Sequence, residues 1–276
     1  MKRIASLSCF FLLVACSTSP PSSATFKPPE SFQSYKNYVN ARFKAALNKP
    51  FDSADPRPKL LLIGDSQAKD FLNSAQEDGY FNHYQVRMRY IGSQCQIFLG
   101  KPQDSGVIEK LRVPCQNADN LQRMRPQIAK ADVVILSGLW RRWALEQLPN
   151  TILNLRLKPT QKLVVVGRKS YGRVIMSRYR AMPVAERVKQ RKQIGRRFLA
   201  DNAKIAGQLL PKQFINQYAL TCGVGSSQCP IFTPQGEFIT FDGGHLTKAG
   251  ARHVGKQLLQ SPTFKSLGRV SRKHSN

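Results

Sequence analysis

Short apolar runs alternate along this chain with longer segments in which apolar residues recur every three or four positions. The runs at 59–63, 133–136 and 163–166 are typical of strands buried on both faces of a parallel sheet. Residues 84–91 alternate as a strand does, and 214–220 is interpreted as a fifth strand. The longer segments predict helices over 31–48, 67–78, 118–130, 141–157, 184–209 and 247–260. Such alternation predicts a parallel sheet covered by helices on both faces, with its active edge at the carboxyl ends of the strands.

The N-terminal residues resemble a bacterial lipoprotein signal. Two basic residues precede an apolar stretch over 4–15, which is too short to span a bilayer comfortably. The stretch ends in LVAC, a pattern similar to the lipobox, and a Ser- and Pro-rich segment follows. We therefore expect 1–15 to be a lipoprotein signal peptide, Cys16 to be lipidated and 16–31 to be a tether. An ordinary signal peptide with a chance cysteine is the alternative. Residues 32–276 are expected to form a single domain with its core at about 58–260.

Charge and location together restrict the partners. The 276 residues include 43 Lys and Arg against 16 Asp and Glu, a formal net charge of +27. Such a surface attracts nucleic acid, anionic lipid headgroups or anionic polysaccharides. In the cell envelope nucleic acid is an unexpected partner, so an anionic envelope polysaccharide and the membrane, reached through the lipid anchor, remain. Ser17 is not the aspartate that retains lipoproteins at the inner membrane, so the periplasmic face of the outer membrane is the expected location.

Basic residues are densest between 168 and 197, where eleven Lys and Arg stand against Glu186 alone. The segment has two interpretations. It is either the solvated face of a helix or a landing surface for an anionic glycan or membrane.

The cysteine count fits an oxidising compartment. Of six cysteines, Cys9 leaves with the signal peptide and Cys16 takes the lipid, which leaves four. Four cysteines allow three pairings, and proximity in sequence favours two local disulfides. A zinc site is the alternative, although neither pair has metal-ligand spacing with a histidine nearby. The expected disulfides are Cys95–Cys115 and Cys222–Cys229.

Two motifs at opposite ends of the domain carry the candidate chemistry. Gly64, Asp65 and Ser66 follow the strand at 59–63 and lead into a helix, whose free N–H groups favour an anion beside a serine nucleophile. Near the C-terminus, Asp242 and His245 stand three apart on a Gly-rich loop before the last helix. His245 would then deprotonate Ser66, while Asp242 orients the imidazole. The alternatives are a helix cap at 65–66 and an ordinary loop pair at 242–245.

The two motifs together resemble the first and fifth blocks of the SGNH hydrolase superfamily (GDSL-type). The similarity is greatest to the SGNH domain of bacterial envelope O-acyltransferases. It covers roughly 58–260 and includes the stretch ADVVIL that runs to Trp140. The resemblance implies a three-layer α/β/α fold with a flavodoxin-like parallel sheet. It implies Ser66, Asp242 and His245 as the catalytic residues, and the backbone N–H groups of Ser66 and Gly92 as the oxyanion hole.

The chain departs from this family in its third block. Where the superfamily carries Gly-x-Asn-Asp, with an asparagine that donates to the oxyanion, this chain has Ser137-Gly138-Leu139-Trp140. The loss of one oxyanion donor costs about 10²–10³ in turnover in other enzymes. Weak or specialised activity is therefore compatible with the sequence.

The resemblance implies an esterase or acyltransferase that acts on O-acyl groups, O-acetyl above all, of an envelope polysaccharide through an acyl-enzyme on Ser66. It implies no metal or organic cofactor, and it allows a membrane acyltransferase as a partner. The alternative is a non-catalytic lipoprotein that binds an anionic polymer on a degenerate SGNH scaffold. The intact Ser66, Asp242 and His245 favour the enzyme, and the missing asparagine favours the binding protein.

Overall fold

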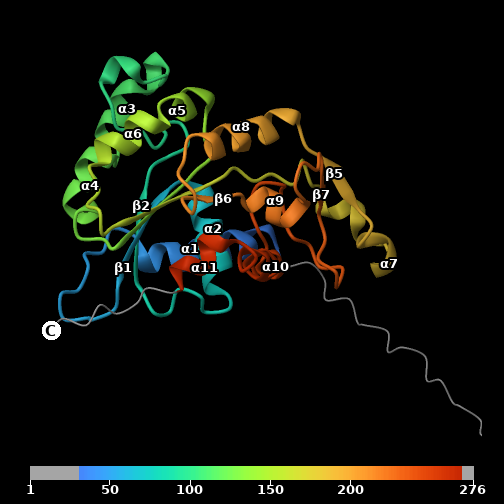
Figure 1. Cartoon of the computed structure of the whole chain (residues 1–276). Coiled ribbons are helices and arrows are strands. Elements are labelled where there is room, and N and C mark those ends of the chain that lie inside the picture. The colour runs from blue at the N-terminus through green and yellow to red at the C-terminus, as the bar shows by residue number, and fades with distance from the viewer. Residues whose placement is uncertain (1–30, 269–276) are drawn as a thin grey trace, which may run out of the picture. The chain divides into compact units, whose positions relative to one another are not determined.

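A computed structural model describes residues 31–268, so the expected signal peptide, Cys16 and most of the expected tether lie outside the described residues. Its centre is a five-stranded sheet in the order β2-β1-β3-β4-β6, with every neighbouring pair parallel (Figure 1). The strands are β1 (Lys59–Gly64), β2 (Gln85–Tyr90), β3 (Val133–Ser137), β4 (Lys162–Val166) and β6 (Phe214–Ile215). This order confirms the predicted flavodoxin-like parallel sheet.

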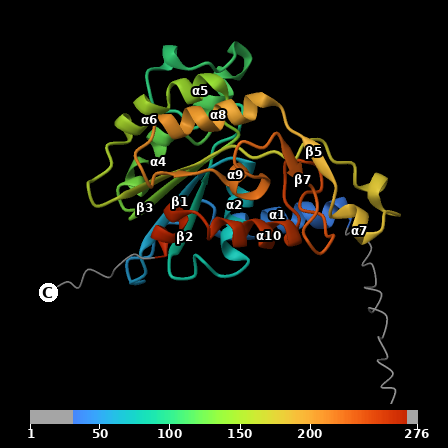
Figure 2. The ribbon, with the colours of Figure 1, turned by 45° about the vertical axis from the view of Figure 1, so that its right-hand side comes forward.

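Alternate residues of each strand build the two cores, because successive side chains of a strand point to opposite faces. Leu60 and Leu62 belong to one core, whereas Leu61 and Ile63 belong to the other. Helices cover both faces, which completes the three-layer architecture (Figure 2). The first face packs against α1 (Phe32–Ala46), α2 (Ser66–Gln76), α10 (Lys248–Leu258) and α11 (Pro262–Leu267). The second packs against α4 (Leu121–Ile128), α5 (Arg142–Glu146), α6 (Leu148–Leu155) and α8 (Arg196–Gly207).

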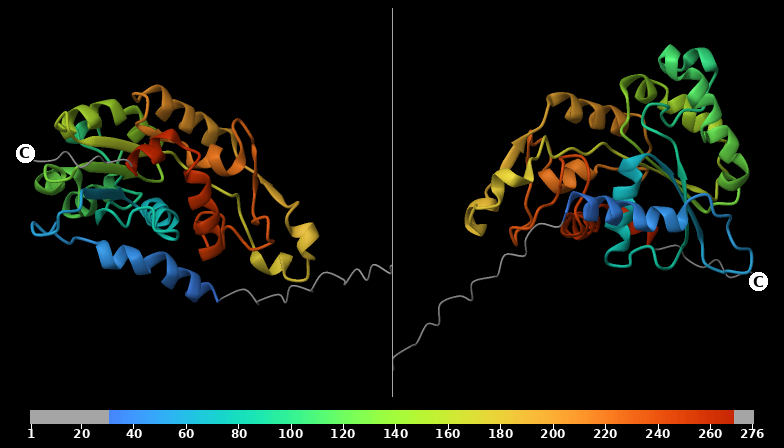
Figure 3. Two further views of the ribbon diagram at one scale, coloured as in Figure 1. Left: turned by 60° about the horizontal axis from the view of Figure 1, so that its bottom comes forward. Right: turned by 180° about the vertical axis from the view of Figure 1, so that it is seen from behind.

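The predicted helix over 184–209 is wrong. The segment forms α7 (Val184–Arg187), then the short strand β5 (Arg191–Gln193), and only then α8. The strand pairs antiparallel with β7 (Gln228–Pro230), so backbone pairing with a distant segment outweighs the local helical pattern (Figure 3). Most of the basic segment is consequently not one helical face.

The predicted strand over 214–220 is correct only at its first two residues. Only Phe214–Ile215 joins the sheet as β6, and α9 (Gln217–Cys222) follows at once. The side chain of Asn216 accepts a hydrogen bond from the Ala219 N–H at 3.0 Å, which caps this helix. The pattern of apolar residues over 214–220 predicts a strand, whereas the cap at Asn216 starts a helix within it.

Helix ends differ from the predictions elsewhere for similar reasons. Asn120 caps α4, so that helix begins later than the predicted 118. The segment 141–157 divides into α5 and α6, with a proline in the first turn of α6, where it is well tolerated. The described residues also contain 3-10 helices η1 (Pro102–Asp104), η2 (Glu109–Leu111) and η3 (Met176–Tyr179), together with α3 (Arg112–Asn117).

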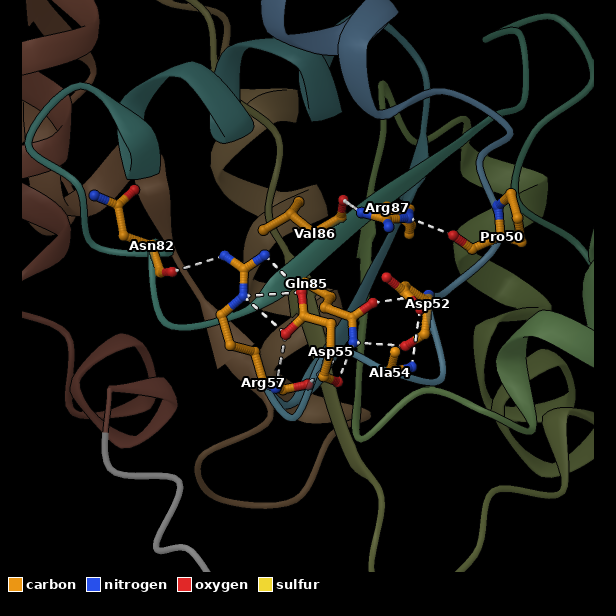
Figure 4. Close-up of polar contacts among 9 residues, drawn as sticks. All are labelled: Pro50, Asp52, Ala54, Asp55, Arg57, Asn82, Gln85, Val86 and Arg87. Carbon is orange, nitrogen blue, oxygen red and sulfur yellow. Dashed lines mark hydrogen bonds and ion pairs between the residues drawn. The ribbon is translucent and has the colours of Figure 1, made fainter.

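A polar network closes the amino edge of the sheet, opposite the candidate site (Figure 4). The buried Gln85 side chain accepts from the Asp52 N–H at 3.0 Å and donates to the carbonyls of Asp52 and Asp55. Arg57 pairs with Asp55 at 2.7 Å. These bonds fix the loop that leads from α1 into β1.

The two predicted disulfides are both present. Cys95–Cys115 braces the long connection after β2, and Cys222–Cys229 joins the end of α9 to β7. Because β7 pairs with β5, the second disulfide also fixes the middle of the basic segment. Within residues 31–268, no helix has the length and apolar character that a membrane crossing requires.

Candidate active site

Ser66 is the first residue of α2, directly beyond the carboxyl end of β1. The turn between them depends on Gly64, because a Cβ at this position would lie 1.7 Å from the Ser137 carbonyl oxygen. Only glycine allows so close an approach of β1 and β3. The half-buried Ser66 therefore stands at the carboxyl edge of the sheet and at a helix N-terminus, as the sequence predicted.

Asp65 has a structural role beside Ser66. Its carboxylate caps α2 by accepting the Gln67 N–H at 2.8 Å, and its other oxygen accepts the Leu139 N–H at 2.8 Å. Burial raises the pKa of Asp65, although the hydrogen bonds from Leu139 and Gln67 oppose this shift. The capping alternative is thus correct for Asp65, and the same residue ties the Ser66 turn to the loop after β3.

Asp242 and His245 form a hydrogen-bonded pair on the loop before α10. Asp242 Oδ2 lies 2.7 Å from His245 Nδ1, while Asp242 Oδ1 accepts the backbone N–H groups of Gly244 and His245 at 2.8 and 2.7 Å. The ionised Asp242 carboxylate accepts a hydrogen bond from His245 Nδ1, so Nδ1 carries the proton. The other ring nitrogen, Nε2, then has a free lone pair. Such an arrangement suits a base that takes a proton at Nε2.

Each member of this pair shifts the pKa of the other. The hydrogen bond to Asp242 raises the pKa of His245, although burial opposes this shift. Burial alone would raise the pKa of Asp242, but the hydrogen bonds from His245 outweigh it and lower that pKa to about 2. Asp242 therefore stays ionised at neutral pH and stabilises a protonated His245.

The loop that carries His245 is fastened to α2 by a buried ion pair that the sequence analysis did not identify. Asp70 is fully buried, accepts the Leu246 N–H at 3.3 Å and pairs with Lys169 Nζ at 2.7 Å. The Lys169 ammonium also donates to the Gly244 carbonyl. Two loops, one after β4 and one before α10, thus meet at a single carboxylate.

The position of Asp70 brings the serine motif and the histidine motif together. Asp70 lies four residues after Ser66, so both occupy the same face of α2. The bond from the Leu246 N–H fastens the residue after His245 to Asp70, which lies one helical turn after Ser66. Within residues 31–268, no hydrogen bond joins Ser66 to His245. Catalytic contacts of this kind often tighten only when substrate binds.

An aromatic stack supports the imidazole from the side. The Phe241 ring lies parallel to the His245 ring at 5.8 Å, and Tyr35 of α1 stacks on Phe241 at 5.3 Å. Phe241, Tyr35 and Val39 form a small core of their own. The helix predicted at 31–48 therefore contributes to the candidate site through packing.

The predicted oxyanion donor Gly92 lies at the same edge of the sheet. The Ile91 N–H donates to the Gly64 carbonyl at 3.0 Å, which places Gly92 beside the Ser66 turn. The buried Gln96 holds this region together. Its amide donates to the Leu139 carbonyl at 3.2 Å and accepts the Arg141 N–H at 2.7 Å.

The third block supplies no obvious replacement for the missing asparagine. The N–H of Leu139 is already bound by Asp65. Trp140 is buried, and its indole N–H donates to the Val166 carbonyl at 3.0 Å.

The described residues contain no group of three or more His, Cys, Asp or Glu that a metal ion would need.

The sequence contains only weak indications that Asp70 and Lys169 support the candidate site. Asp70 is a polar residue on the buried face of a predicted helix, one turn from the serine, which is a recognisable pattern. Lys169 belongs to the basic segment, and it stands three residues after the end of β4, at the active edge. Its burial against Asp70 could not be inferred from charge density.

The sheet order and the loops at its carboxyl edge are those of an α/β domain of the SGNH type. The chain belongs to the SGNH domain family described as fused to AT3 domains, whose model matches residues 36–260. The periplasmic domain of a Salmonella ser. Paratyphi A lipopolysaccharide acetyltransferase has a similar structure, with a TM-score of 0.54. The two are 18% identical over 83% of this chain and 95% of that chain, so this likeness concerns the fold alone. Curated protein sequences give no match to this chain.

Proposed function

We propose that this protein hydrolyses or transfers O-acyl groups, O-acetyl above all, of an envelope polysaccharide through an acyl-enzyme on Ser66. The observation that carries the proposal is the Asp242–His245 pair, whose loop is fastened through the Leu246 N–H to the buried Asp70, one helical turn after Ser66. Membership of the SGNH family supports acyl-ester chemistry, and the acetyltransferase domain with the same fold supports it further.

In the proposed reaction, His245 Nε2 takes the hydroxyl proton as Ser66 Oγ attacks the ester carbonyl carbon. The tetrahedral oxyanion is stabilised by the N–H groups of Ser66 and Gly92. His245 then gives its proton to the departing alcohol oxygen, and the acyl group remains on Ser66. Water releases a carboxylic acid from this intermediate, whereas a sugar hydroxyl takes over the acyl group as a new ester. Asp242 stabilises the imidazolium in both halves of the reaction.

We propose further that the protein is held at the periplasmic face of the envelope through a lipid on Cys16. The two disulfides support an oxidising compartment. A membrane acyltransferase would be the donor of the acyl group in a transfer reaction. Mass spectrometry of the mature N-terminus tests the anchor: we expect acylated Cys16, and cleavage at another position contradicts it.

A binding protein on the same scaffold is the second candidate. The observation that favours it is the third block, where Leu139 and Trp140 leave no side-chain donor for the oxyanion. Such a protein would bind an anionic polymer in a salt-sensitive way without acyl release.

Hydrolysis of p-nitrophenyl acetate and of an O-acetylated polysaccharide separates the two candidates. The experiment compares wild-type protein with Ser66→Ala and His245→Ala. If the proposal is right, both variants lose nearly all acyl release, because nucleophile and base act as one unit. If the wild type is inert toward both substrates but binds anionic polysaccharide, the binding function is favoured instead.

A further inference from the structure

A pocket of about 780 Å³ opens beside the third-block loop, on the face of the sheet where α5 and α8 lie side by side (Figures 1 and 2). Leu139 and Trp140 belong to its lining. The Leu139 N–H is bonded to Asp65, so one lining residue adjoins the turn that carries Ser66.

Arginines dominate the polar lining of this pocket, and two of them lack a carboxylate partner. Arg142 is paired with Glu146, and Arg168 is paired with Asp201. Arg141 and Arg197 line the pocket too, and neither makes an ion pair within residues 31–268. The pocket thus has an uncompensated positive charge, although Glu146 belongs to its lining.

The location of Arg197 favours an anion beside it. Arg197 lies in the first turn of α8, which contains no acidic residue. The helix dipole is positive at this end and disfavours a cation there. Two buried donors on lining side chains, Arg168 Nε and Trp143 Nε1, have no hydrogen-bond partner among the described residues. Unpaired buried donors cost free energy, and because these two atoms are closed to solvent, an acceptor oxygen of a ligand would reach them only after a lining side chain shifts.

The remaining lining is aromatic. Trp143 and Phe198 both face this pocket, and the Arg168 guanidinium lies over the Phe198 ring at 4.1 Å. Flat apolar surfaces beside a few polar groups are typical of sites for ring-shaped ligands. Arginine matches the planar fork of a carboxylate. The combination suits a sugar ring that carries a carboxylate better than a free inorganic anion.

We propose that this pocket binds a uronic acid unit of the polysaccharide whose O-acyl group reacts at Ser66. The inference rests on the proposed function and names its substrate class, an acidic glycan. It also divides the basic segment into parts with different tasks. Lys169 is buried in the support of the His245 loop, whereas Arg197 is exposed and meets substrate.

Calorimetric titration in the Ser66→Ala background tests the pocket without any turnover. The probes are tetragalacturonate and the neutral galactose tetramer. We expect the acidic probe to bind at least about tenfold more tightly, and Arg141→Gln with Arg197→Gln to remove at least about tenfold of its affinity, as the loss of charged hydrogen bonds implies. The matched control is Arg196→Gln, on the same helical turn but outside the pocket lining. It should change affinity less than about twofold, as expected for an exposed charge.

Several results overturn this inference. These are equal affinity for the acidic and neutral probes, no binding of either, equal losses in the Arg196 and Arg197 variants, or inorganic phosphate binding as tightly as the sugar. Failure of the proposed function is distinguishable, because it shows as absent acyl release by wild-type protein. Acidic-sugar binding that depends on Arg141 and Arg197 would support the pocket even then.

Discussion

Asp70 and Lys169 form a fully buried ion pair, with Lys169 Nζ 2.7 Å from Asp70 Oδ2, at the point where the His245 loop meets α2. The pair connects three segments that are far apart in sequence. It gives a physical reason for the approach of the serine motif to the histidine motif.

Lys169→Met should destabilise the protein strongly, because it leaves the Asp70 carboxylate buried without a counter-charge. Breaking a buried pair in this way costs about 3–5 kcal/mol. Urea unfolding measures the loss. Lys189→Met is a matched control, because Lys189 pairs with Glu186 on the surface at 2.9 Å. An exposed pair contributes about 0–1 kcal/mol. Adding Asp70→Asn to Lys169→Met should restore part of the stability. Equal losses in the Lys169 and Lys189 variants would contradict the role of the pair.

The rate of acyl release should rise with pH as His245 loses its proton, since only the neutral imidazole accepts one from Ser66. The hydrogen bond to Asp242 raises the His245 pKa, so the inflection should lie above the ordinary value of 6.5. Asp70 and Lys169 also act on this imidazole, with opposite signs. Asp242→Asn removes the largest cause and leaves burial, so the inflection should move to lower pH and the rate should fall. An inflection that does not move would show that Asp242 does not control His245.

The same two shifts predict how stability depends on pH. A raised His245 pKa contributes stability that is present below pH 6.5 and is lost as pH rises through the folded-state value. A lowered Asp242 pKa contributes stability that is present above pH 3.8 and is lost as pH falls through about 2. Thermal unfolding of wild type and Asp242→Asn across this range measures both contributions. Parallel curves for the two proteins would contradict the coupling.

Removal of the Cys95–Cys115 disulfide should lower the free energy of unfolding by about 3 kcal/mol, which is the chain-entropy expectation for a loop of this size. The bond spans 20 positions of sequence, whereas Cys222–Cys229 spans 7. The shorter loop should contribute less. Urea unfolding of the paired Cys→Ser variants checks the order, and a larger loss for the shorter loop would contradict it.

Strands β1, β3 and β4 could be predicted from sequence because they are short apolar runs that no other element resembles. The strand at 59–63 and the turn at Gly64 followed from local pattern alone. The basic segment could not be predicted in the same way. Its central residues 191–193 pair with 228–230, and that pairing has no local signature.

The candidate catalytic residues could be named from sequence because two short motifs carried them. The residues that hold the catalytic residues in place could not be predicted from the sequence, because their role depends on contacts between loops. Asp70 and Lys169 lie 99 positions apart, and Gln96 bonds to residues after β3. Charge density placed Lys169 on the surface, whereas the fold buries it.

The central claim is that Ser66 is a nucleophile activated by His245. Intact-protein mass spectrometry after treatment with a fluorophosphonate reagent tests it most directly. If the claim is right, wild-type protein gains one covalent adduct that peptide mapping places on Ser66. Ser66→Ala gains none, His245→Ala reacts far more slowly, and Ser53→Ala, changed at an exposed serine before β1, reacts as the wild type does. An unmodified wild-type protein, or an adduct of equal yield in Ser66→Ala, would contradict the claim.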